Sequence, residues 1–219
     1  MKQLLIKIAD SVYILLCLAS TASAEQARPY FTLLGGFNLT DEIVLSDQTG
    51  DYIASVEPGF FAGGALGYDL GDAFPQLGKG RLELEFGYRY NLLKEAHFST
   101  GTVYAEGDLS TISVMFNAIG EYENYSPYYV PYIGIGLGAA TVSMIETSAA
   151  GSPMIDDSDT RFAYQVLTGL TFPVSGNLVM DLGYRYFGTL KPEFIDSQNQ
   201  QVEVDYANHS FELGLRLGF

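Results

Sequence analysis

Large apolar residues alternate with polar or small residues along most of the chain after residue 29. The last stretch, FELGLRLGF (211–219), shows the pattern most clearly, because every second residue from Phe211 to Phe219 is leucine or phenylalanine. A period of two is typical of a β-strand with one apolar face. The pattern predicts eight strands, at residues 30–38, 59–70, 81–91, 109–124, 129–144, 161–174, 178–188 and 206–219.

The connections between the predicted strands alternate between short and long. GDAFPQLGKG, YSPY and SGN are compact and rich in turn-forming residues, whereas the connections near 39–58, 92–108, 145–160 and 189–205 are long and polar, with many acidic residues. Compact domains seldom contain four structureless loops of this length, but barrels of the outer membrane do, together with short periplasmic turns. The sequence therefore predicts an all-β fold, an eight-stranded antiparallel transmembrane up-and-down β-barrel, with four exposed acidic loops and periplasmic termini.

The polar positions of the strands predict the contents of the barrel. In LELEFGYRY (82–90) the leucine and aromatic residues share one face, and Glu83, Glu85 and Arg89 share the other. An apolar face turned to lipid leaves the charges in the lumen, which eight strands make just wide enough for side chains. Charges in so narrow a space need partners. We expect a salt-bridge network that fills the lumen, with Glu83, Glu85, Arg89, Glu121, Asp181, Arg185, Glu212 and Arg216 as members.

Two other interpretations fit the same alternation. A soluble lipid-binding barrel has its apolar residues inside, and periodicity alone does not exclude it. The unequal connections and the terminal Phe219 favour the membrane instead. Within a membrane barrel, the inward charges would also suit a narrow ion path.

Aromatic residues lie near both ends of the predicted strands. Tyrosine suits the boundary between lipid and water because its ring is apolar and its hydroxyl is hydrated, and membrane barrels carry aromatic girdles at both boundaries. We predict an outer girdle of Tyr88, Tyr90, Tyr184 and Tyr186 and an inner girdle of Tyr122, Tyr128 and Phe172.

The first 24 residues have the features of a cleaved secretory signal peptide. Lys2 and Lys7 precede a short apolar segment, and ASA at 22–24 is a typical cleavage site. Cys17 follows Leu16, which is too large for a lipoprotein signal. The remaining domain, residues 25–219, has no cysteine and carries 25 acidic and nine basic residues, a net charge of −16. Such a charge excludes nucleic-acid binding, and export predicts the outer membrane of a Gram-negative bacterium.

Both histidines of the chain have a serine nearby. His97 stands two residues before Ser99, and His209 directly precedes Ser210. Outer-membrane lipid A deacylases use a histidine and a serine at the first spacing for acyl transfer, but they carry the pair on a lipid-facing strand late in the chain. We interpret both pairs as structural and predict no catalytic residue.

Acidic residues in two of the long connections invite comparison with calcium loops. Asp156, Asp157 and Asp159 form the run IDDSD, and Asp51 follows Thr49 and Gly50. A calcium loop needs a glycine turn and a closing bidentate glutamate, and the IDDSD segment has neither. We predict no metal site and no cofactor, while weak association with divalent cations stays open.

Several stretches together resemble one group of proteins. HSFELGLRLGF is similar to the C-terminal signature of Gram-negative outer-membrane barrels, and STISVMFNAIGEY, PYIGIGLGAA and MDLGYRYFGT resemble strands of the opacity-type surface antigens, a group of OmpA-like eight-stranded barrels. The resemblance implies that the barrel assembly machinery reads the last strand. The residues of this assembly signal would be Phe211, Leu213, Leu215, Leu217 and Phe219.

The resemblance also implies partners and a function. The wall would contact outer-membrane lipid and lipopolysaccharide, and the loops would contact a host or environmental ligand. The implied function is non-enzymatic, either in envelope integrity or as an adhesin-like antigen. Two alternatives stay open: a small ion-conducting porin that uses the lumen, and a lipid A-modifying enzyme that uses His97.

The lumen charges also predict how the last two strands pair. Inward residues must face inward residues, because a slip of one position turns charges into lipid. A register in which paired positions sum to 397 sets Arg185 opposite Glu212 and Asp181 opposite Arg216. Opposite charges then face each other directly, as cross-strand energetics favour.

Overall fold

A computed structural model describes residues 28–41, 43–47, 50–71, 79–98, 101–122, 126, 128–149, 151–197 and 200–219. The predicted signal peptide lies outside the described residues. Eight strands build the main sheet: β1 (Arg28–Thr40), β4 (Gly59–Asp69), β5 (Lys79–Phe98), β6 (Gly101–Glu121), β7 (Val130–Ala149), β9 (Asp157–Ser175), β10 (Leu178–Thr189) and β13 (Ala207–Gly218). No helix among the described residues is long and apolar enough to cross a membrane.

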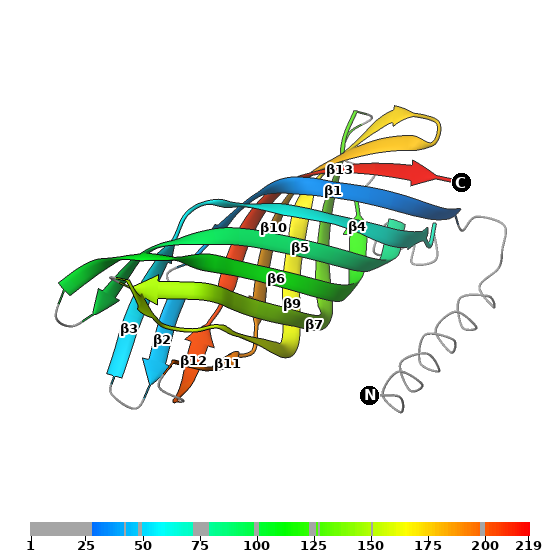
Figure 1. The fold of residues 1–219 in the computed structure, drawn as a ribbon. Coiled ribbons are helices and arrows are strands. Elements are labelled where there is room, and N and C mark those ends of the chain that lie inside the picture. The colour runs from blue at the N-terminus through cyan, green and yellow to red at the C-terminus, as the bar shows by residue number, and fades with distance from the viewer. Residues whose placement is uncertain are drawn as a thin grey trace, which may run out of the picture.

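The eight strands close into a ring (Figure 1). The order of pairing is β1, β4, β5, β6, β7, β9, β10, β13 and back to β1, and every pair is antiparallel. The closing pair sets Tyr30 of β1 opposite Gly218 of β13. A closed ring satisfies the backbone groups of every strand, as hydrocarbon surroundings require. The predicted eight-stranded antiparallel barrel is confirmed, and each predicted strand overlaps one strand of the ring.

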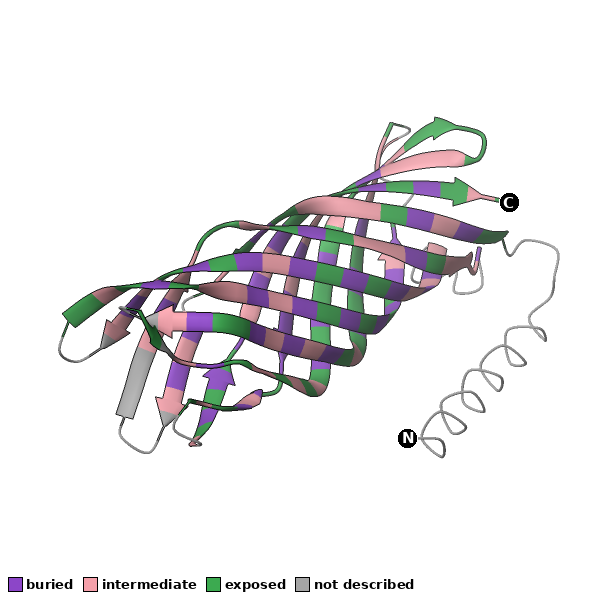
Figure 2. Cartoon of the chain, in the orientation of Figure 1, coloured by how far each residue is buried: buried purple, intermediate pink, exposed green. Residues whose placement is uncertain are grey.

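Buried and exposed residues alternate along the barrel strands (Figure 2). On β5, Glu83, Glu85 and Arg89 are buried in the lumen, whereas Phe86 on the outer wall is 52% exposed. Exposed apolar side chains continue around the wall, including Leu33, Leu66, Phe116, Ile135, Leu182, Leu213 and Leu215. The wall is therefore apolar outside and polar inside, which is the arrangement of a barrel surrounded by lipid.

The four long connections also contain strands, so the prediction of structureless loops is wrong. Between β1 and β4 the chain forms β2 (Ile43–Asp47) and β3 (Gly50–Val56), and between β10 and β13 it forms β11 (Glu193–Ile195) and β12 (Gln201–Asp205). β12 pairs with β2, and β3 pairs with the outer end of β5. The hairpin of β5 and β6 and the end of β7 extend as strands, and β8 (Ser152–Pro153) pairs with β7.

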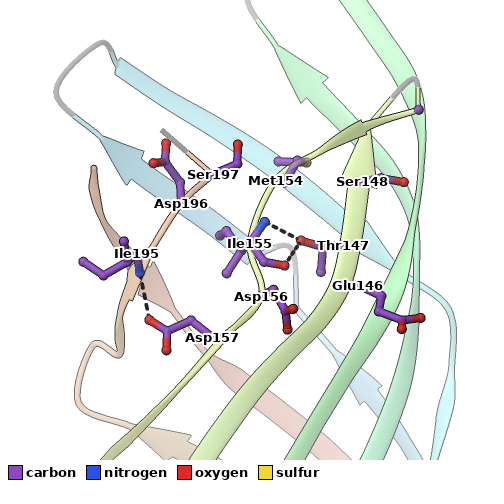
Figure 3. A pocket seen from close by; sticks show the side chains of 11 residues that line it. Glu146, Thr147, Ser148, Met154, Ile155, Asp156, Asp157, Ile195, Asp196 and Ser197 are labelled. Atoms are coloured by element: carbon purple, nitrogen blue, oxygen red, sulfur yellow. Dashed lines mark hydrogen bonds between the residues drawn. The ribbon is translucent and has the colours of Figure 1, made fainter. Parts of the chain in front are cut away.

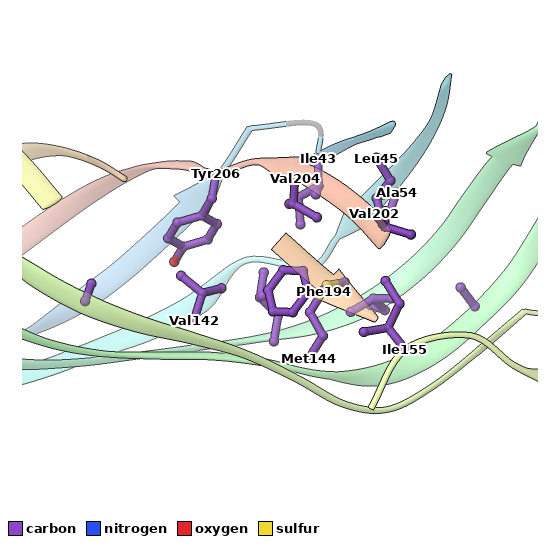
Figure 4. Close-up of a cluster of buried hydrophobic side chains, with 14 of the residues drawn as sticks. Ile43, Leu45, Ala54, Val142, Met144, Ile155, Phe194, Val202, Val204 and Tyr206 are labelled. Atoms are coloured by element: carbon purple, nitrogen blue, oxygen red, sulfur yellow. The ribbon is translucent and has the colours of Figure 1, made fainter. Parts of the chain in front are cut away.

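The described residues within 41–57, 92–109, 141–161 and 190–206 form what we call the outer storey, and the rest of the ring is the membrane storey. Figure 1 places β2, β3, β11 and β12 at the end of the barrel opposite to the C-terminus. Figure 4 shows that the outer storey encloses an apolar core. Its buried side chains include Ile43, Leu45, Ala54, Leu93, Val142, Met144, Ile155, Phe194, Val202 and Val204. This core explains why polar-rich segments fold into strands: every second residue has an apolar interior to face.

The pairing of β10 with β13 differs from the predicted register by two residues. Paired positions sum to 395, which sets Arg185 opposite Ser210, Gly183 opposite Glu212 and Asp181 opposite Gly214. Inward residues still face inward residues, but Arg185, Glu212 and Asp181 each stand opposite a small residue. Two large side chains directly opposite each other would compete for the same space in a narrow lumen, whereas Gly183 and Gly214 leave room for the carboxylates.

Candidate functional site

Arg185 is the centre of an upper cluster of charges, in the part of the lumen nearer to the outer storey. Its guanidinium forms ion pairs with Glu85 and Glu212, the second at 3.0 Å between Nη2 and Oε1. Nη1 also donates to Oε1 of Gln165 at 3.1 Å. Arg185 is 1% exposed. Four strands, β5, β9, β10 and β13, thus meet at one buried cation.

Two buried amides add hydrogen bonds to the upper cluster. Nε2 of Gln165 donates to Oδ1 of Asn117 at 2.7 Å, and Nδ2 of Asn117 donates to Oε2 of Glu85 at 2.9 Å. Neither amide was predicted as part of the site. A buried carboxylate needs further donors besides its ion pair, so amides at inward positions of the strands are the signal that would have found them.

Arg89 is buried in the lumen, but it does not join the predicted salt-bridge network. It forms no ion pair with any described carboxylate, and Nη1 donates to Oγ of Ser113 at 3.2 Å. Its guanidinium carbon lies 3.9 Å from the ring centroid of Phe187 and 4.8 Å from that of Phe61. The negative faces of these rings attract the cation, while Glu85 is occupied by Arg185.

A lower cluster fills the part of the lumen near the C-terminal end of β13. Nη2 of Arg216 lies 3.1 Å from Oε1 of Glu121 and 3.3 Å from Oδ1 of Asp181. Arg81 binds Glu121 as well, and its Nε lies 3.1 Å from Oε1 of Glu83. Glu121 therefore joins two arginines from two different strands.

Arg81 and Tyr30 are members of the lower cluster that sequence reasoning missed. The hydroxyl of Tyr30 donates to Oε1 of Glu83 at 2.8 Å, and the ring lies 5.3 Å from the guanidinium carbon of Arg216. Arg81 lies two residues before Glu83 on β5, so the alternation along the strand already placed it on the inward face. All eight predicted lumen charges are buried inside the barrel.

The predicted outer girdle residues lie on the outer wall, and some form ring contacts there. Tyr184 and Tyr186 lie 5.9 and 5.2 Å from the ring of His209. Tyr88 is 37% exposed, and the hydroxyl of Tyr90 donates to Asp108 at 2.7 Å. At the other end of the barrel Tyr122 and Tyr128 are exposed, and Phe172 contacts the ring of Tyr129. Their action as girdles stays a prediction.

His209 and Ser210 lie in an arrangement that does not suit acyl transfer. Ser210 is buried and bonds to Asn208, whereas His209 faces outward, with Nδ1 2.6 Å from the Tyr184 hydroxyl and Nε2 3.3 Å from Asp41. His209 and Ser210 therefore point to opposite sides of the wall. An acyl-transfer pair needs the histidine within reach of the serine.

The partner of His97 is a serine that sequence reasoning missed. Nε2 of His97 lies 3.2 Å from Oγ of Ser55, and Nδ1 lies 2.8 Å from Oγ1 of Thr102. Ser99 lies outside the described residues. The nearest paired acid, Glu95, lies 3.8 Å from the same Nε2 that faces Ser55. A catalytic triad needs its acid on the other ring nitrogen, where it orients the imidazole.

Two of the IDDSD aspartates form hydrogen bonds with the backbone of the edge strand β11. Oδ2 of Asp157 accepts the backbone N–H of Ile195 at 2.9 Å, and Oδ2 of Asp159 accepts that of Glu193 at 2.8 Å. These bonds satisfy donors of β11 that have no strand partner. No described group of three or more acidic, histidine or cysteine side chains has the arrangement of a metal site, and the side chain of Asp51 lies outside the described residues.

Electrostatics reinforce the contact at Asp159. Arg161 lies 2.6 Å from Asp159 and 2.9 Å from Glu193. Partial burial acts to raise the pKa of the Asp159 carboxyl, but the N–H of Glu193 and the guanidinium of Arg161 outweigh it and hold this pKa below its usual value. The carboxylate is therefore the form that holds β11 in place.

A surface pocket of about 580 Å³ lies beside these aspartates (Figure 3). Its wall combines the acidic residues Glu146, Asp156, Asp157 and Asp196 with apolar residues such as Met154 and Ile195. The hydroxyl of Thr147 donates to the carbonyl of Ile155 and accepts its N–H, at 2.6 and 2.7 Å. The outer storey thus presents an acidic recess supported by its own hydrogen bonds.

Comparison with known proteins agrees with this geometry. The family described as outer membrane protein beta-barrel domain matches residues 11–219. The chain belongs to this family. It is 29% identical over 209 residues to the outer membrane protein PagN of Salmonella typhimurium, covering 84% of this chain and 83% of PagN.

Solved structures show the same fold. Neisserial surface protein A covers 86% of this chain and 97% of its own, with 21% identity and a TM-score of 0.53. OprG from Pseudomonas aeruginosa covers 86% and 95%, with 14% identity and a TM-score of 0.54. The protein is an outer-membrane β-barrel protein, as its sequence predicted.

Proposed function

We propose that this protein has a non-enzymatic function, in which the membrane storey anchors the outer storey at the cell surface. There the outer storey contacts a host, the environment or neighbouring envelope components. The observation that carries the proposal is the contrast between a lumen filled by buried ion pairs and an outer end built around an apolar core. Such a lumen suits an anchor, and a folded outer end offers a fixed surface to a partner.

The proposed orientation places the outer storey outside the cell and both ends of the barrel chain in the periplasm, after removal of residues 1–24. The extended strands lie at the end of the barrel opposite to the C-terminus (Figure 1). A turn of Gly176 and Asn177 joins β9 to β10 at the other end. Long external segments and short periplasmic turns are the usual arrangement of such barrels.

The charge of the outer storey supports a partner with basic groups. Exposed carboxylates include Glu57, Glu106, Glu146, Asp156, Glu203 and Asp205, whereas the exposed lysines there are Lys94 and Lys191. Complementary potentials favour association, and like charges oppose it. Lipopolysaccharide phosphates would accordingly approach this surface only through bridging divalent cations.

The test removes the outer surface and keeps the anchor. β2–β3 and β11–β12 are replaced together by short turns, because these hairpins pair with each other. The chimera and the whole protein are compared on cells for binding to host cells and to polylysine. We expect lost binding with an unchanged amount in the outer membrane. Full binding by the chimera would contradict the proposal.

Two measurements address the alternatives. The refolded protein should show no steady open state in planar bilayers, because buried ion pairs occupy the lumen. A steady conductance would favour a small porin. Expression should leave the mass of lipid A unchanged, and a change that His97→Ala abolishes would favour an enzyme.

A further inference from the structure

A small enclosed cavity lies between the upper and lower clusters of the lumen. Its volume is about 20 Å³, and its polar wall is formed by Thr32, Arg81, Glu83, Tyr132, Asp181, Arg185 and Glu212. A buried water needs roughly 10–15 Å³ of such space and two to four polar partners. The cavity therefore has room for one water molecule.

Four polar atoms of the residues that line this cavity have no hydrogen-bond partner within the described part of the chain: Nε of Arg81, Nε of Arg185, Oγ1 of Thr32 and Oε2 of Glu212. Thr32 and Glu212 are the two of these residues that offer an acceptor. The two residues are 3% and 8% exposed. Oε1 of Glu212 already accepts from Arg185. Buried polar groups nearly always have a protein or water partner, and an unmet carboxylate oxygen is unfavourable.

The charges around the cavity select a neutral ligand. Arg81 and Arg185 would repel a metal cation, and Glu83, Asp181 and Glu212 would repel an anion. Water carries two donors and two acceptors. It can donate to the carboxylate of Glu212 and form a second hydrogen bond with the hydroxyl of Thr32.

Gly214 keeps this space open. A Cβ at position 214 would lie 3.2 Å from Cβ of Asp181, 3.3 Å from Cδ2 of Leu34 and 3.5 Å from Cγ2 of Thr32. We propose that the lumen binds one ordered water, held by Glu212 and Thr32, which links the upper and lower clusters into one network.

A crystal structure of the refolded protein tests the site directly. The wild type should show one ordered water within hydrogen-bond distance of both Oε2 of Glu212 and Oγ1 of Thr32. Thr32→Val, which keeps the shape of the side chain and removes the hydroxyl, should lose this water or leave it on Glu212 alone. A wild-type cavity with no water, or a water that touches neither atom, would overturn the proposal.

Thermal unfolding in detergent supplies a second test. Thr32→Val should lower the midpoint more than the control Thr141→Val, because the hydroxyl of Thr141 lies at the surface, 2.8 Å from that of the exposed Thr160. In a Glu212→Gln background the effect of Thr32→Val should shrink, since the two side chains share one water. Strictly additive losses, or equal effects at both threonines, would contradict a shared water.

Discussion

The membrane storey and the outer storey use the same strands with opposite polarity. On β7, Ile133 and Ile135 point outward in the membrane storey and alternate with glycines that point inward. A few residues later, Val142 and Met144 are fully buried inside, and Ser143 faces outward. β5 changes in the same way, from an inward Asn91 to a buried Leu93, which lies within the register shift between Leu92 and Glu95.

This inversion shows that the surroundings decide which face of a strand is apolar. The pleat alternates in the same way in both storeys. Lipid around the membrane storey selects apolar residues outside and leaves polar groups to satisfy one another within. Water around the outer storey selects the reverse, because burial of apolar surface is favourable there. One continuous strand can therefore belong to two kinds of core.

The largest expected effect tests whether the membrane storey depends on the end of its last strand. Phe219 is 73% exposed, and its N–H donates to the carbonyl of Pro29 at 3.1 Å. Deletion of Phe219 should leave most of the protein outside the membrane, because the proposed assembly signal is lost. The level in the outer membrane and resistance to heat in SDS measure this. Leu190→Ala, an exposed change in the outer storey, is the control; equal levels of both variants would contradict the prediction.

Removal of one lumen charge should destabilise the membrane storey strongly. Arg185→Ala leaves Glu85 and Glu212 without their shared cation, and breaking a buried ion pair costs about 3–5 kcal/mol. Unfolding in urea and detergent measures the loss. Adding Glu212→Ala should restore part of it.

The control for this prediction is an exposed ion pair of the outer storey. Lys191 and Asp205 lie 3.2 Å apart with both side chains about half exposed, so Lys191→Ala should have little effect. A double variant at 185 and 212 whose losses simply add would contradict the coupling.

A core substitution should separate the two storeys. Phe194→Ala removes a fully buried ring from β11 and should destabilise the outer storey by about 3 kcal/mol, as large-to-small core changes do. Added protease should then cut the outer storey on intact cells while the barrel keeps its heat resistance. Loss of the whole barrel would show that the storeys fold as one unit. Ile195→Ala, at the exposed neighbour, is the matched control.

The smallest expected effect concerns the edge strand β11 and pH. The pKa of Asp159 is lowered in the folded state, so its contribution is present at neutral pH and is lost as the pH falls through this lowered pKa. Asp159→Asn should cost about 1 kcal/mol of outer-storey stability at neutral pH. Hydrogen exchange of the Glu193 amide measures it. The exposed Asp156→Asn should not change this exchange; a similar change in both variants would argue against the contact.

The sequence was sufficient for the membrane storey because its rule is simple. Lipid outside and a narrow lumen inside force strict alternation, so the positions of Glu85, Arg185 and Glu212 followed from strand parity alone. The register was wrong by two residues because opposite charges were paired directly, while the structure sets Gly183 and Gly214 opposite the carboxylates. The alternation along a strand decides which face a residue lies on. It does not decide the register, because a long charged side chain can reach a partner from more than one register.

The outer storey was missed because its acidic residues suggested solvated loops. Val202, Val204 and Tyr206 alternate with Glu203 and Asp205, which is the pattern of a half-buried strand. The partner strand, β2, lies far away in the sequence, and nothing local identifies it. Arg89 shows a similar limit, because the two rings that hold it come from β4 and β10.

The pairing of β12 with β2 has a consequence for antibodies raised against the protein. Glu203 lies opposite Ser46, and Val204 lies opposite Leu45. An antibody against this surface would contact every second residue of two segments from opposite ends of the chain. A linear peptide from either segment would not present these outward residues together. Variation of this surface is also restricted: the exposed Glu203 can change freely, whereas Val204 can change only as far as Leu45 and the shared core allow.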